Sequence, residues 1–215
     1  MTPGARRPAI GDRRPLLYLV TDRRLCAPGR LIDRVEAALR GGVGAVQLRE
    51  KDLDGGPLRD LAAALLPICR RFGAPLLING RIDVALATDA DGVHLPSDSF
   101  RPAEARSLLG PEKIIGVSTH HPEDVASAAV DGADYALFGP IFATPSKASF
   151  GEPQGLEQLR RAVASAPIPV IAIGGITADR AEVIRAAGAA GIAAIAALLS
   201  PLDGESAARA FGHSA

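Results

Sequence analysis

Three polar side chains in one short segment have the chemistry to hold an anion. Gln47, Arg49 and Lys51 occupy alternating positions. In an extended segment alternating residues point to the same side, so one side would carry two cations and an amide. That combination favours a site for a dense anion such as a phosphate. The other interpretation is a surface cluster of ion pairs with Glu50 and Asp52.

Further polar residues follow other short apolar runs of the chain. Asn79, ahead of Gly80, carries an amide that can donate to a phosphate or accept from a ring amine. A later segment, 118–121, contains a serine, a threonine and two histidines. Ser118 and Thr119 could bind a substrate, or they could cap a helix that begins near Pro122.

Two glycine-containing segments complete the set of candidates. Residues 139–147 hold Thr144, Ser146 and Lys147 among glycine and proline, which is typical of a substrate clamp. Gly174 and Gly175 follow another apolar run and precede a helical stretch. Backbone N–H groups at such a junction form the usual phosphate site of a barrel, together with the loop after the next strand.

The elements that position these residues alternate along the chain. Eight short apolar runs are each followed by a stretch with apolar residues at helical spacing, which predicts eight parallel strands and a closed (β/α)8 TIM barrel. Runs without polar alternation suit strands covered on both faces, and His94, inside one run, is predicted to be a packed, hydrogen-bonded core residue. An open doubly wound sheet is the alternative. The runs are 16–21, 45–48, 75–78, 92–95, 113–118, 135–139, 169–173 and 191–196.

Domain organisation follows from length and from four similar helix-to-strand joins, at 41–46, 89–93, 131–135 and 187–192. These joins precede every second run, so the barrel reads as four βαβα quarters. No linker divides the 215 residues, and we expect one barrel domain over 15–215. Residues 1–14 contain four arginines without an apolar region behind them, which indicates a flexible N-terminal tail rather than a signal peptide.

Composition narrows the classes of function. The chain has 24 basic and 24 acidic residues, so it lacks the basic surplus of nucleic-acid-binding proteins. No apolar run is long enough to span a membrane. Two cysteines without a metal-binding spacing favour a reduced, cytoplasmic protein. The predicted partners are therefore small phosphorylated molecules, and exposed barrel helices leave a homodimer possible.

Taken together, these motifs resemble the thiamine phosphate synthase family and its sister group, the thiazole tautomerases. The resemblance runs from Leu17 to the final helix. Its most specific parts are Gln47-Leu48-Arg49-Glu50-Lys51, Gly139-Pro140-Ile141-Phe142 with Thr144-Pro145-Ser146-Lys147, and Ile173-Gly174-Gly175-Ile176. Synthases of this family join an aminopyrimidine methyl diphosphate to a thiazole phosphate and release diphosphate. This chemistry depends mostly on neutralising the charge of the leaving group.

The resemblance also implies roles for individual residues. Ser118 would lie near the leaving diphosphate, with Lys51 and Lys147 as the catalytic cations. The diphosphate would be held by Gln47, Arg49, Lys51, Asn79 and Lys147. The thiazole phosphate would be held by Thr144, Ser146 and backbone groups of Gly175, Ile195 and Ala196; alanine at 196, where serine is common, leaves that backbone contact intact.

Two departures concern magnesium, the cofactor that the resemblance implies. Where the family has two aspartates that carry Mg²⁺, this chain has Gly80 and Ser99. The metal would then rest on the diphosphate and water, unless Asp98 or Asp83 supplies a carboxylate. Loss of that stabilisation costs several kcal/mol, or roughly a hundredfold to ten-thousandfold in rate.

Two alternatives remain open at this point. Tautomerases move a proton on a thiazole carboxylate phosphate without diphosphate, using a histidine at the position of His120, and histidine is a suitable proton carrier near neutral pH. The segment 95–100 also looks more like tautomerases, whereas Gln47 and Lys51 favour a synthase. A third possibility is a non-catalytic protein that binds thiazole phosphate.

Overall fold

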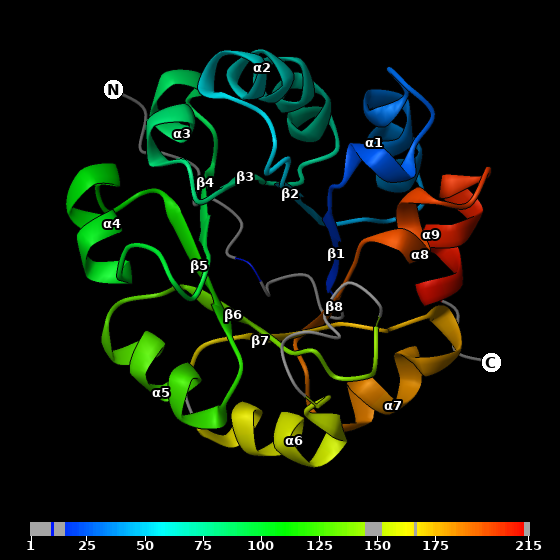
Figure 1. Ribbon diagram of the computed structural model, residues 1–215. Coiled ribbons are helices and arrows are strands. Elements are labelled where there is room, and N and C mark those ends of the chain that lie inside the picture. The colour runs from blue at the N-terminus through cyan, green and yellow to red at the C-terminus, as the bar shows by residue number, and fades with distance from the viewer. Residues whose placement is uncertain (1–9, 11–15, 145–151, 166, 213–215) are drawn as a thin grey trace.

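The chain forms a closed barrel of eight parallel strands in sequence order, with β8 paired to β1 (Figure 1). The computed structural model describes residues 10, 16–144, 152–165 and 167–212. Closure confirms the TIM barrel and excludes the open sheet. None of the helices in the described ranges has the length and apolar character needed to cross a membrane.

Strand positions agree with the apolar runs to within one or two residues at each end. The strands are β1 Leu16–Val20, β2 Ala45–Leu48, β3 Leu76–Asn79, β4 Gly92–Leu95, β5 Ile114–Thr119, β6 Tyr135–Phe138, β7 Val170–Ile173 and β8 Gly191–Ala194. All but a few of their side chains are buried, as expected for parallel strands that are covered on both faces.

Helices follow the strands and surround the barrel as an outer ring (Figure 1). They are α1 Leu31–Arg40, α2 Gly55–Arg71, α3 Ile82–Thr88, α4 Pro102–Leu109, α5 Pro122–Val130, α6 Gly155–Ser165, α7 Ala181–Ala186, α8 Ala196–Leu199 and α9 Gly204–Gly212, with short 3₁₀ turns η1 Arg23–Leu25 and η3 Ala178–Arg180. The apolar stripe of each long helix faces the strands. In α1, for example, Leu31, Val35, Ala38 and Leu39 are buried.

Buried apolar residues form two clusters, one between helices and strands and one inside the barrel. Along each strand, residues alternate between the two, as the two-residue period of a strand requires. In β1 the side chains of Leu16, Tyr18 and Val20 belong to the interior cluster, whereas Leu17 and Leu19 belong to the outer one. The interior is therefore a packed core.

The predicted N-terminal tail lies largely outside the described residues. Ile10 is the one residue of 1–14 that the structure describes. Its side chain is buried and belongs to the interior cluster with Leu16 and Ile114. At this position, therefore, the segment ahead of β1 contacts the barrel.

Strand register brings the predicted polar residues to one end of the barrel. Gln47 is paired with Val20 and with Leu77, and Asn79 is paired with His94. Ser118, two residues beyond the partner of His94 in β5, lies at the carboxyl end of its strand. The carboxyl ends of the strands are where TIM barrels carry their active sites.

Gly116, in β5, leaves room for the ring of Tyr135 in the barrel interior. A Cβ at this position would overlap Cζ, Cε1 and the hydroxyl oxygen of Tyr135. We expect Gly116→Ala to lower the free energy of unfolding by about 1–3 kcal/mol, because the interior has no space into which the ring can move. Urea titration at pH 7 measures this loss.

Gly56→Ala is the matched control, because a Cβ at Gly56 meets nothing within 4 Å. This exposed position near the start of α2 should tolerate alanine with no loss of stability. Equal stability of the Gly116→Ala variant and the parent would contradict the packing described here.

Candidate active site

A buried carboxylate fixes the end of β2. The side chain of Glu50 is about 1% exposed and accepts a hydrogen bond from Thr21 Oγ1 at 2.7 Å. The same Thr21 oxygen accepts the backbone N–H of Arg49 at 2.9 Å. The backbone N–H of Arg23 also donates to both oxygens of Glu50, at 3.1 and 3.0 Å. Residue 49 is thereby attached to the loop after β1.

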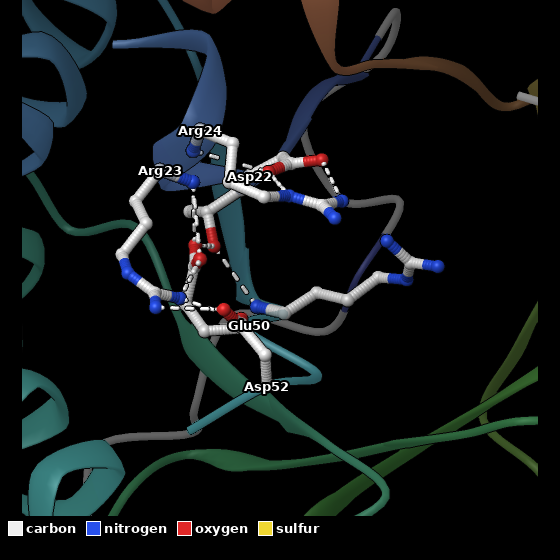
Figure 2. Close-up of polar contacts among 7 residues, drawn as sticks. Asp22, Arg23, Arg24, Glu50 and Asp52 are labelled. Carbon is white, nitrogen blue, oxygen red and sulfur yellow. Dashed lines mark hydrogen bonds and ion pairs between the residues drawn. The ribbon is translucent and has the colours of Figure 1, made fainter. Parts of the chain in front are cut away.

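Arg23 neutralises both acidic neighbours of the cationic motif (Figure 2). Its guanidinium donates to Glu50 at 3.2 Å and to both oxygens of Asp52, at 2.7 and 2.8 Å. Among the described residues, neither Arg49 nor Lys51 has a carboxylate within ion-pair distance. The interpretation of the motif as ion pairs between these cations and Glu50 and Asp52 is therefore wrong.

A second ion pair, between Arg24 and Asp22, lies beside the contacts of Arg23. Arg24 donates to both oxygens of Asp22, at 2.8 and 2.7 Å, and this contact lowers the pKa of the Asp22 carboxyl (Figure 2). Partial burial lowers the pKa of the Arg49 guanidinium, and the negative charge of Asp22 opposes that shift. Arg49 is thus a partly desolvated cation, which interacts more strongly with an anion than a fully hydrated one does.

Two amides line the barrel interior next to Arg49. The side chain of Gln47 is buried, and its Nε2 donates to Asn79 Oδ1 at 3.1 Å. This bond fixes the orientation of the Asn79 amide and leaves its NH₂ group as a donor. The structure therefore brings the predicted residues Gln47 and Asn79 together.

Ser118 contacts a buried histidine. Its Oγ lies 2.8 Å from Nε2 of His94, and Nδ1 of His94 lies 3.1 Å from the hydroxyl of Tyr135. His94 is 1% exposed, which confirms the prediction of a hydrogen-bonded core histidine. Thr119 Oγ1 donates to the backbone oxygen of Leu137. Neither hydroxyl caps the helix that begins at Pro122, so that alternative for Ser118 and Thr119 is wrong.

His120 is held by its neighbours at the barrel mouth. Its Nδ1 lies 2.6 Å from the carbonyl oxygen of Gly139, so Nδ1 carries a hydrogen and donates it. Asp124 accepts the backbone N–H groups of His120 and His121 and thus caps α5. In a neutral His120 the other ring nitrogen, Nε2, is an acceptor.

Backbone donors lie at the ends of β7 and β8. Ile173 pairs with Ala193, so Gly175 and Ile195, each two residues further along the chain, lie just beyond the ends of adjacent strands. In the described ranges, the backbone N–H groups of Gly175, Ile195 and Ala196 donate to no protein acceptor. Gly175 has a φ of 64°, and a Cβ there would lie 2.8 Å from the oxygen of Ala143. Glycine is therefore required at this point.

Of the other predicted substrate-binding residues, two lie in the described part of the chain and two do not. Lys51 is exposed at the mouth, and Thr144 is partly buried at the end of the described segment after β6. Ser146 and Lys147 lie outside the described residues.

Comparison with known proteins agrees with this arrangement. The sequence model of the family described as thiamine monophosphate synthase matches residues 17–198. The chain belongs to this family. It is 46% identical to the thiamine-phosphate synthase of Roseiflexus castenholzii, over 92% of the chain and 86% of that protein. It is 48% identical to that of Chlorobium luteolum, over 91% of both. The thiamine phosphate pyrophosphorylase structure from Pyrococcus furiosus superposes with a TM-score of 0.84, at 36% identity over 92% and 93% of the chains.

Gly80 and Ser99, at the two positions where the family has aspartates, supply no carboxylate to a magnesium ion. Gly80 has no side-chain ligand, and Ser99 Oγ donates to the carbonyl oxygen of Pro96. Asp98 is exposed, and in the described part of the chain no three His, Cys, Asp or Glu side chains cluster as a metal site. Other carboxylates near the strand ends already have partners: Asp22 with Arg24, Asp52 with Arg23, and Asp83 with Arg81. These residues do not fit a magnesium ion held by the protein.

Several residues that support this site have contacts that were not predicted from the sequence. Thr21, Arg23 and Glu50 form the attachment of β2 to β1, and Tyr135 supports His94. One signal was available: Glu50 follows Arg49 directly, so in an extended segment its side chain points away from the anion site and needs its own cation.

Buried His94 makes stability depend on pH. Burial lowers its pKa from 6.5 to about 3, so below pH 6.5 the unfolded chain binds a proton that the folded chain does not. The stabilisation that neutral, buried His94 contributes to the fold is complete above pH 6.5 and is lost as the pH falls toward 3. Between pH 7 and 5 we expect the parent to lose about 2 kcal/mol more unfolding free energy than His94→Gln does.

Urea titrations at the two pH values measure this difference. His121→Gln, at an exposed histidine, is the control and should retain the full loss. Identical losses in the parent and in His94→Gln would show that His94 is protonated in the folded protein.

Proposed function

We propose that this chain joins hydroxymethylpyrimidine diphosphate to thiazole phosphate and releases diphosphate, as a thiamine phosphate synthase. The observation that carries the proposal is the position of Arg23. Because it neutralises Glu50 and Asp52, the charges of Arg49 and Lys51 remain available to an anion at the barrel mouth. The names of the relatives point to the same reaction.

In the proposed reaction the bond between the pyrimidine methylene carbon and the diphosphate oxygen breaks. The diphosphate leaves with the electron pair, and the thiazole captures the resulting pyrimidine cation. Arg49 and Lys51 would stabilise the charge that develops on the leaving group. The Asn79 amide, oriented by Gln47, and the hydroxyl of Ser118 would donate hydrogen bonds to it. We assign Lys147 the same task, as an expectation from its motif.

The thiazole phosphate would occupy the other side of the mouth. Within the described ranges the N–H groups of Gly175, Ile195 and Ala196 donate to no protein acceptor, and they are suited to phosphate oxygens, because backbone donors there need no rearrangement on binding. Thr144 and Ser146 would add hydroxyl contacts.

Magnesium enters this proposal through the substrate. When bound, Mg²⁺ would neutralise part of the diphosphate charge, held by the phosphate oxygens and water with at most Asp98 from the protein. Since the described carboxylates do not form a metal site, we assign the stabilisation of the leaving group to the side-chain cations.

The central test is formation of thiamine phosphate by purified protein given both substrates, with excess Mg²⁺ and separately with EDTA. We expect product with Mg²⁺, and we expect Lys51→Ala to lower kcat by about 10²–10³, since a donor to a developing charge is lost. The ratio of the parent's rate with EDTA to its rate with Mg²⁺ measures how far the side-chain cations suffice without the metal.

Arg71→Ala is the control, because this exposed cation is the last residue of α2, at the end of the helix that leads to the amino end of β3 and so opposite the mouth, and it pairs with Glu36. It should change the rate by less than twofold. Absence of product at high concentrations of folded protein, in both metal conditions, would exclude the synthase.

One observation favours a second candidate, a thiazole tautomerase. Because Nδ1 of His120 donates to Gly139, Nε2 is left as the acceptor that a proton carrier needs. A tautomerase would isomerise thiazole carboxylate phosphate without metal. We expect His120→Ala to abolish that isomerisation, followed by NMR of the substrate, and to leave thiamine phosphate formation within about tenfold of the parent. Binding of thiazole phosphate with neither activity would indicate a non-catalytic binding protein.

The compartment and the partners of the protein follow from the proposed reaction. We place it in the cytoplasm, with phosphorylated pyrimidine and thiazole molecules as partners and without a role for nucleic acid or membrane. A homodimer formed through exposed barrel helices stays a prediction.

A further inference from the structure

Four polar groups form a continuous hydrogen-bonded chain across the barrel interior. Tyr18 and Tyr135 are joined through their hydroxyl oxygens at 2.8 Å, Tyr135 contacts His94 Nδ1 at 3.1 Å, and His94 Nε2 contacts Ser118 Oγ at 2.8 Å. Tyr18, Tyr135 and His94 are 0–1% exposed, whereas Ser118 is partly exposed at the strand ends. The chain, which we call the interior relay, therefore runs from the core to the mouth.

The groups of the interior relay are all neutral near pH 7. Burial lowers the pKa of His94 to about 3, and burial raises the pKa values of Tyr18 and Tyr135 above the ordinary value for tyrosine. Four neutral groups supply four hydrogens, one each, for three hydrogen bonds. One hydrogen is therefore left over, on a group that only accepts from its neighbours.

Three arrangements satisfy all three bonds. In the outward arrangement Tyr18 donates to Tyr135, Tyr135 donates to His94 Nδ1, and His94 Nε2–H donates to Ser118, whose hydrogen is free at the mouth. In the inward arrangement every bond reverses, and the free hydrogen belongs to Tyr18. In the third arrangement Tyr18 and His94 Nδ1–H both donate to Tyr135, Ser118 donates to His94 Nε2, and the free hydrogen belongs to Tyr135.

The surroundings of the two tyrosines decide among them. The side chain of Tyr18 is 0% exposed and lies in the apolar interior cluster, and the described residues offer its hydroxyl no acceptor other than Tyr135. The hydroxyl of Tyr135, whose side chain is also 0% exposed, has no partner among them beyond Tyr18 and His94. The inward and the third arrangement would each bury a donor without an acceptor, which disfavours each by roughly tenfold or more. The outward arrangement leaves its free hydrogen on Ser118, where a ligand can accept it.

We propose that His94 is a positioning residue, whose Nε2–H donates to Ser118 and so directs the Ser118 hydrogen toward an anion at the barrel mouth. That the anion is the leaving diphosphate rests on the proposed function. The direction of donation has a further consequence. His94 cannot accept the Ser118 proton, so this Ser–His contact is not an activated nucleophile, although its distance resembles one.

The direct test is the tautomer of His94 in the whole protein labelled with ¹⁵N-histidine. The His94 resonances are identified by their loss in His94→Gln. We expect the hydrogen on Nε2 at pH 7, with Nδ1 as a hydrogen-bonded acceptor. In Tyr135→Phe the Nδ1 resonance should move toward that of an unbonded acceptor, whereas Tyr18→Phe should leave the tautomer unchanged. A hydrogen on Nδ1 in the parent would overturn the proposal.

A double-mutant cycle tests whether the relay acts through Ser118. We expect Tyr135→Phe to lower kcat about tenfold with less than a twofold change in KM, and to have no further effect in a Ser118→Ala background. Equal effects in both backgrounds would mean that Tyr135 has only a structural role. A fluorophosphonate probe should form no adduct at Ser118, and an adduct would overturn the outward arrangement.

These measurements separate the two proposals. If the protein forms no thiamine phosphate, the synthase proposal fails, and the tautomer and the probe still decide the direction of the relay.

Discussion

Closure of the sheet imposes one constraint on every strand: alternate side chains must share a single interior. Apolar residues fill most of that space, and Gly116 is present because the Tyr135 ring occupies the position its side chain would take. The polar residues allowed inside must find partners there, since an unpaired buried polar group is costly. Gln47 with Asn79, and His94 between Tyr135 and Ser118, meet this requirement. The partners that satisfy the core thus also orient the groups at the mouth.

Acidic and basic side chains at the mouth also point to different sides of the chain. Strand alternation points Arg49 toward the site and Glu50 away from it, into a buried position where Arg23 and Thr21 satisfy its oxygens. A carboxylate next to two cations would ordinarily pair with them and cancel their charge. Here separate arginines neutralise Glu50 and Asp22, so the cations of the motif keep their charge without burying an unpaired acid.

Much of this arrangement could be predicted from sequence, for identifiable reasons. Apolar runs and helical spacing predicted all eight strands, because a closed parallel barrel leaves few ways to order them. Gln47, Asn79 and Ser118 could be placed at one end of the barrel because strand ends in this fold meet at one face. The partners of these residues were not found, since the bond between His94 and Ser118 depends on barrel register and that between Arg23 and Glu50 on loop geometry. The support lent by Tyr18 and Tyr135, 117 residues apart, has no local signal in the sequence.

The partly buried cation at the mouth also affects the protein before an anion binds. Burial disfavours the charged form of Arg49, which has no carboxylate within ion-pair distance among the described residues, so the protein without a ligand carries a desolvation cost. Binding of a diphosphate would offset that cost and stabilise the folded state by mass action. Because Arg49 directly follows β2, which pairs with β1, and β1 closes the barrel against β8, the gain extends to the whole fold. The lifetime of this protein in a cell would then rise with the supply of its own substrate.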